Sequence, residues 1–151
     1  MMKRLALDVG DATIGVAISD VLGITARGLF TLKRTNYRSD IQQIMETVKG
    51  EDAGAIVVGL PINLDGTDSV QTAKVRDFAT KLRNRMRSNA MADVEVILHD
   101  ERFTTKIAER ALIEADMSRA KRAKIIDSQA AVVILQSYLE SLRLPNGRDK
   151  R

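Results

Sequence analysis

The chain has 151 residues, a length that suits one domain with a sizeable hydrophobic core. The absence of cysteine excludes disulfides and thiolate metal sites and predicts a reducing compartment, the cytoplasm. No apolar stretch has the length of a signal sequence or a membrane span, so we expect no membrane contact. Lysine and arginine number 24 against 20 acidic residues, which gives a net charge of only +4.

The first third of the chain has the pattern of three strands. Apolar runs cover residues 4–9, 14–19 and 24–32, and short polar turns separate them. Connections this short join antiparallel neighbours, which predicts a meander.

From Ser39 onward, helical and strand patterns alternate. The pattern predicts a helix that starts near Ser39 and stops near Gly50, a buried strand at 55–58, a helix with its apolar stripe at 75–86, a strand at 94–98, a helix marked by 108–115 and a final helix at 125–142. This order predicts an α/β fold, a mixed five-stranded sheet with helices on both faces. Residues 145–151 are expected to form a charged tail.

Three carboxylates occupy positions where the apolar pattern predicts burial. Asp8 closes the first strand, Glu101 follows the fifth, and Asp127 opens the final helix on its apolar stripe. A buried carboxylate must be neutral, paired or bound to a metal. Because sites in such sheets form at the carboxyl ends of the strands, we predict that the three converge. Together they would bind a hard cation, Mg²⁺ or Mn²⁺.

Each of these residues also has a purely structural interpretation. Asp8 could close a turn, and Asp127 could cap the helix that it opens. Strand alternation points Asp100 and Glu101 to opposite faces, and the apolar run before them does not tell which faces inward. The sole histidine, His99, is more simply a structural residue at a strand end than a general base.

Basic residues are clustered in two segments. The cluster between residues 76 and 87 is interpreted as a solvated helix face. The second cluster, formed by Arg119, Lys121, Arg122 and Lys124, directly precedes Asp127. Positive charge beside an acidic, metal-competent site suggests a polyanionic substrate such as nucleic acid, so we predict that the second cluster contacts phosphates.

Five short motifs resemble the YqgF/RuvX family. They are LDVG at 7–10, IGVA at 14–17, VGLP at 58–61, DERFTT at 100–105 and IDSQAA at 126–131. Members of this family have been called Holliday junction resolvases and are implicated in maturation of small-subunit ribosomal RNA. The resemblance implies a ribonuclease H-like fold, with residues 1–144 as a single nuclease domain. It also favours Glu101 over Asp100 as the second acid.

The resemblance implies a divalent-metal-dependent nuclease that acts on precursor ribosomal RNA or on branched DNA. Asp8, Glu101 and Asp127 would be the catalytic metal ligands, with Asp8 bridging two Mg²⁺ or Mn²⁺ ions. The candidates for phosphate binding are Arg102, Lys106, Arg122 and Lys124. The chain departs from the family pattern at Asp11-Ala12-Thr13, where a carboxylate stands in place of basic residues near the site.

Two other functions fit parts of the sequence. A non-catalytic nucleic-acid-binding ribosome-assembly factor would keep the fold without the chemistry. The first two motifs also resemble a phosphate loop of actin-like ATPases, but those proteins need two domains and this chain supplies one. The sequence leaves open whether the protein is a monomer or a weak homodimer, and whether its substrate is DNA or RNA.

Overall fold

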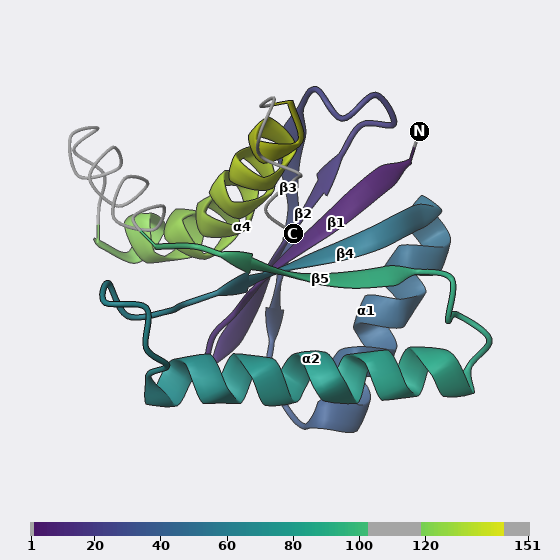
Figure 1. The fold of residues 1–151 in the computed structure, drawn as a ribbon, viewed down its shortest axis with the longest axis horizontal. Helices are drawn as coiled ribbons and strands as arrows, with labels where there is room; N and C mark the ends of the chain where they lie inside the picture. Colours follow the sequence, from purple (N-terminus) through teal and green to yellow (C-terminus); the bar gives the residue numbers. More distant parts are fainter. Residues whose placement is uncertain (1, 103–118, 144–151) are drawn as a thin grey trace.

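The computed structural model describes residues 2–102 and 119–143, and in the second range it describes side chains from Gln129 onward. A five-stranded sheet in the order β3-β2-β1-β4-β5 forms its centre (Figure 1). The strands are β1 (Lys3–Val9), β2 (Thr13–Ser19), β3 (Ala26–Lys33), β4 (Ala53–Leu60) and β5 (Glu95–Asp100). The helices are α1 (Tyr37–Glu51), α2 (Val70–Ser88) and α4 (Arg119–Arg143).

The sheet is mixed, as the sequence predicted. β1 pairs antiparallel with β2, and β2 pairs antiparallel with β3, which confirms the meander. On its other side β1 pairs parallel with β4, and β4 pairs parallel with β5. The carboxyl ends of β1, β4 and β5 therefore lie at the same end of the sheet.

One face of the sheet is covered by α1 and α2 (Figure 1). Alternate residues of β1 point to this face, namely Leu5, Leu7 and Val9. They pack with the apolar stripes of the two helices, whose fully buried members include Phe78 and Leu82. With so few aromatic residues in the chain, aliphatic side chains fill most of this core.

The other face is covered by α4 and has a smaller core (Figure 1). Small residues such as Ala6, Ala17 and Ala131 let the helix lie close to the central strands. Alternation along β1 then places Asp8, like Ala6, on the α4 face.

Helix α1 begins earlier than the Ser39 start that the sequence suggested. Asn36 is its N-cap, and the Asn36 side chain accepts a hydrogen bond from the Ser39 backbone N–H. At the other end, Asp52 adopts a left-handed conformation with φ 55° and closes the helix, so Gly50 lies inside it. The sequence pattern places the N-cap at Ser39, about one turn too late, because asparagine caps a helix as well as serine does and Asn36 takes that role.

Helix α4 begins at Arg119, six residues before the predicted start. Asp127 therefore lies within the helix and does not open it, so the interpretation of Asp127 as an N-cap does not apply. The sequence pattern separates the basic residues from the final helix, although lysine, arginine and alanine all favour helix.

The helix predicted around 108–115 falls outside the described residues. Within the described ranges, no helix combines the length and apolarity that crossing a bilayer requires.

Candidate active site

Asp8 is the penultimate residue of β1, the central strand of the sheet. It pairs with Gly15 of β2 and is half-buried on the α4 face. The preceding residue, Leu7, pairs with Val58 of β4, so the end of this central strand is a rigid position for a functional carboxylate.

Glu101 lies directly after β5, at the same end of the sheet, and its backbone N–H donates to the Leu60 carbonyl at 3.1 Å. Its side chain lies over Gly59 of β4, because a Cβ built on Gly59 would overlap the Glu101 Oε2 and the Ile134 Cδ1 of α4. The Glu101 carboxylate therefore lies on the α4 face, as Asp8 does. Sequence reasoning missed Gly59 as part of the site, although it stands in the VGLP motif.

The Asp8 carboxylate is close enough to affect the ionisation of Glu101. Burial, together with the negative charges of Asp8 and Asp100, raises the pKa of Glu101 from its usual value of 4.5 to about 7. A carboxyl group whose pKa lies this high, beside a second carboxylate, is typical of functional sites.

Asp100 faces away from this pair and has a different role. Its carboxylate accepts hydrogen bonds from the Arg102 backbone N–H at 3.0 Å and from the Arg102 Nε at 2.8 Å. Burial raises the pKa of Asp100, but the hydrogen bonds with Arg102 outweigh this effect and hold the pKa below its usual value. Arg102 also donates to the Leu64 carbonyl at 3.4 Å. This bond connects the β4–α2 loop to the segment that carries Glu101.

His99 precedes Glu101 by two residues and, like Glu101, faces α4. Its Nε2 lies 2.9 Å from the Ser137 Oγ, and its ring meets the Tyr138 ring edge-on, with the centroids 5.7 Å apart. Burial lowers the pKa of the imidazole, and the Asp100 charge opposes that effect. These contacts join β5 to α4, which agrees with the structural interpretation of His99.

Asp127, the third predicted acid, belongs to α4, the helix whose Ile134 lies over Gly59. Its side chain and those of Arg122 and Lys124 lie outside the described part of the structure, as does Lys106 entirely. The described side chains contain no group of three acidic, histidine or cysteine residues that could hold a metal ion. Asp8 and Glu101 would therefore need a further ligand from outside that part.

The departure from the family pattern falls in the turn between β1 and β2. Asp11 is exposed, and its carboxylate lies 3.3 Å from the Lys74 Nζ at the start of α2. The pair leaves both side chains more than half accessible, so it contributes little to stability.

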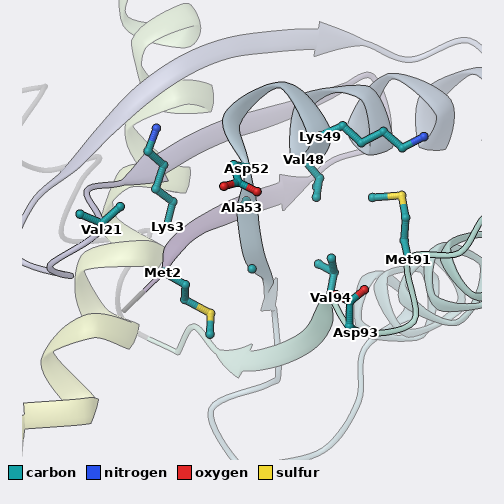
Figure 2. Close-up of a pocket in the computed structure, with 11 residues that line it drawn as sticks. Met2, Lys3, Val21, Val48, Lys49, Asp52, Ala53, Met91, Asp93 and Val94 are labelled. Carbon is teal, nitrogen blue, oxygen red and sulfur yellow. The ribbon is translucent and has the colours of Figure 1, made fainter.

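A hollow of about 400 Å³ lies at the opposite end of the sheet (Figure 2). Its lining residues come from the starts of β1 and β4 and from nearby loops, and include Lys3, Asp52, Ala53 and Val94. Lys3 and Asp8 are five residues apart on one strand, about 16 Å. The acidic pair thus lies outside this hollow.

Solved structures share the fold at low sequence identity. They include T. thermophilus RuvC in complex with a Holliday junction substrate, with a TM-score of 0.56 and 15% identity, covering 93% of this chain and 96% of that one. Fowlpox virus resolvase in complex with Holliday junction DNA has a TM-score of 0.58 and 14% identity, covering 95% and 100% of the two chains. The predicted ribonuclease H-like fold is confirmed.

Relatives of higher identity carry the name "Putative pre-16S rRNA nuclease". The one from Clostridium tetani (strain Massachusetts / E88) is 48% identical over 93% of this chain and 98% of its own length. The one from Thermoanaerobacter pseudethanolicus is also 48% identical, over 93% and 97%. The sequence profile described as "RuvX: Holliday junction resolvase" matches residues 2–141. These names agree with the predicted hydrolysis of phosphodiester bonds, and the chain belongs to the RuvX family of nucleases.

Proposed function

We propose that this protein is a divalent-metal-dependent nuclease that cleaves a precursor of small-subunit ribosomal RNA. The observation that carries the proposal is the placement of Asp8 and Glu101 on one face and at one end of the sheet, with the pKa of Glu101 raised to about 7. The names of the relatives support the choice of RNA as substrate.

The donor set suits a hard cation. Carboxylate oxygens are the ligands that Mg²⁺ and Mn²⁺ prefer, and the described side chains near the pair include no thiolate. Asp8 and Glu101 would hold the cation together with Asp127, the third proposed ligand. When bound there, a divalent cation would neutralise charge at the phosphate and would lower the pKa of an attacking water.

The protein's own part in the reaction is to fix the geometry. Asp8 is held by its pairing with Gly15 of β2, and Glu101 by its backbone hydrogen bond to the Leu60 carbonyl and by its place over Gly59. Such preorganisation lowers the barrier because little rearrangement is needed when the substrate arrives.

For the substrate, we propose phosphate contacts from Lys106, Arg122 and Lys124. Arg102 is already paired with Asp100 and with the β4–α2 loop, and it keeps about a third of its side chain accessible. It can therefore contact a phosphate only in addition to these bonds, which makes it a weaker candidate than the other three. Arginine has five N–H donors, so such sharing is chemically feasible.

Cleavage of branched DNA is the second candidate, and the family description "Holliday junction resolvase" favours it. A resolvase must cut two strands, which needs two copies of the site. We propose residues 1–144 as the nuclease domain and a monomer or weak homodimer in the cytoplasm, where precursor ribosomal RNA is found.

The test is a cleavage assay with Mn²⁺ or Mg²⁺ on two labelled substrates, precursor ribosomal RNA and a four-way DNA junction. We expect site-specific cuts in the RNA that disappear with chelator and in the Asp8→Asn variant. Preferential symmetric cutting of the junction would favour the second candidate. Binding of RNA without cleavage of either substrate would make the protein an assembly factor.

A further inference from the structure

The turn that follows Asp8 is held by side chains from the opposite face of the sheet. The Arg34 Nη1 donates to the Gly10 carbonyl at 2.9 Å, and the Gln71 Nε2 donates to the Val9 carbonyl at 3.1 Å. Arg34 also donates its backbone N–H to the Ala12 carbonyl at 2.9 Å. The two carbonyls that directly follow Asp8 are therefore both bound by side chains from other elements.

Arg34 is itself fixed by a buried partner. Its Nε lies 3.3 Å from Asp40 Oδ2, and the Asp40 side chain is only 1% exposed. The other Asp40 oxygen accepts a hydrogen bond from the Thr35 backbone N–H at 3.1 Å. The Arg34 Cζ lies 5.3 Å from the ring centroids of both Tyr37 and Phe78. The guanidinium has aromatic rings, a carboxylate and a backbone carbonyl around it.

Stability alone is a poor explanation for this arrangement. A buried ion pair often contributes no more than apolar side chains of the same volume, since both charges lose their hydration. A planar guanidinium, however, can bridge a carboxylate and a carbonyl in a fixed geometry, which neither a lysine nor an apolar side chain can do.

We propose that Arg34, held by Asp40, is a positioning residue: it fixes the Val9–Gly10 turn and thereby sets the direction of the Asp8 carboxylate. The inference rests on the proposed function of Asp8. It adds that the precision of the site depends on a charge pair on the opposite face. An error of about 1 Å in a catalytic group can cost a hundredfold in rate.

Two variants separate positioning from a structural role. Arg34→Lys keeps a positive charge for Asp40 but cannot bridge both acceptors, and Arg34→Met/Asp40→Leu replaces the pair with apolar side chains. Arg83→Met is the matched control, because Arg83 also donates to a strand carbonyl, that of Val96 at 2.9 Å, away from the turn. If the double variant fails to fold, Arg34→Lys still tests the proposal.

Three measurements are made on each variant: thermal midpoint, amide hydrogen exchange of Gly10–Thr13 in the metal-free protein, and Mn²⁺ affinity by electron paramagnetic resonance. For both Arg34 variants we expect faster exchange in the turn and Mn²⁺ binding weakened by about tenfold. Where cleavage is measurable, kcat should fall with little change in KM. Arg83→Met should change none of these except the midpoint.

The proposal is overturned if turn exchange and Mn²⁺ affinity stay at wild-type values in the Arg34 variants, whatever happens to the midpoint. A wild-type protein that neither binds Mn²⁺ nor cleaves nucleic acid would instead contradict the proposed function. In that case the exchange of Gly10–Thr13 still decides whether Arg34 holds the turn.

Discussion

The two faces of the sheet differ in composition and in use. The face under α1 and α2 is almost entirely apolar, with large aliphatic side chains from all five strands and both helices. The face under α4 combines a smaller core with Asp8, Glu101 and His99. The first face supplies most of the buried apolar side chains and holds the Arg34–Asp40 pair at its edge, and the second bears the two acids of the candidate site.

This division lets one sheet tolerate a costly site. Two neighbouring carboxylates lower stability by desolvation and repulsion, and a thick aliphatic core on the opposite face offsets that cost. Variants in the aliphatic core and variants of the acidic pair should therefore change different properties of the protein.

The largest effect is expected on catalysis, from Asp8→Asn on the α4 face. Loss of this charge should lower the cleavage rate by about a thousandfold or more, as for other residues that act as a unit. The midpoint of thermal unfolding should hold or rise, because a repulsion is removed. Asp93→Asn, at the opposite end of the sheet, is the control and should cleave normally.

On the α1–α2 face, Leu82→Ala should do the reverse. Leu82 is fully buried, so its truncation should lower the free energy of unfolding by about 2–5 kcal/mol. Below the unfolding transition, cleavage should stay within a few fold of wild type. Leu64→Ala, with a leucine that is 58% exposed, should change stability little in the same denaturant titration. Loss of activity in folded Leu82→Ala would contradict the division between faces.

Glu101→Gln should change how the free energy of unfolding depends on pH, which measures how much the buried Glu101 carboxylate lowers stability. With a pKa of 4.5 unfolded and about 7 folded, Glu101 costs nothing below pH 4.5, because both states are then protonated. Between pH 4.5 and about 7 the unfolded state has lost this proton while the folded state still holds it, so stability falls by roughly 3 kcal/mol across that window, at 1.36 kcal/mol per pKa unit, and is level above it.

The glutamine variant lacks this loss. In metal-free buffer it should match wild type near pH 4.5 and be more stable at pH 8, while being inactive as a nuclease. Denaturant titrations of both proteins at several pH values measure the difference. A constant difference across that range would mean that the pKa of Glu101 is not raised in the folded state.

Gly59→Ala tests the contact between β4, Glu101 and α4. The added methyl would displace Glu101 or Ile134, at a cost of about 1–3 kcal/mol of stability, and cleavage should fall with it. Gly50→Ala is the control, since nothing lies within 4 Å of its added Cβ and alanine favours helix by up to about 1 kcal/mol. Equal behaviour of the two variants would remove Gly59 from the site.

The smallest change is expected from Arg122→Ala/Lys124→Ala. If both contact phosphates, the log–log dependence of RNA affinity on salt should flatten by about 0.7 per lost contact, with little change in midpoint. Arg85→Ala/Arg87→Ala, from the other basic cluster, is the control and should leave the slope unchanged. An unchanged slope with an earlier melt would identify Arg122 and Lys124 as helix-face ion-pair partners.

Periodicity predicted the sheet and most of its order, because alternation and the 3.6-residue stripe are local signals. It could not choose between Asp100 and Glu101, since β5 is apolar on both faces and only its packing decides the choice. In the structure Leu98 packs with the α1–α2 core, whereas Ile97 and His99 face α4, which puts Glu101 with them.

Other features depend on contacts that are distant in sequence. The local sequence around Asp40 does not predict its burial, and only the approach of Arg34 makes that burial possible. Gly59 has no signal of its own, because its lack of a side chain matters only when Glu101 and Ile134 lie above it.

The sheet order also has a consequence for folding. Asp8 comes from the β1–β2–β3 meander, whose strands pair with their neighbours in sequence and therefore pair quickly. Glu101 is placed only after β1 pairs with β4 and β4 pairs with β5, and long segments of chain separate the strands of each pair. Because long loops close slowly, we expect the acidic pair to be assembled late on the folding pathway. A partly folded chain would then lack a complete site, so cleavage would begin only once the whole sheet has formed.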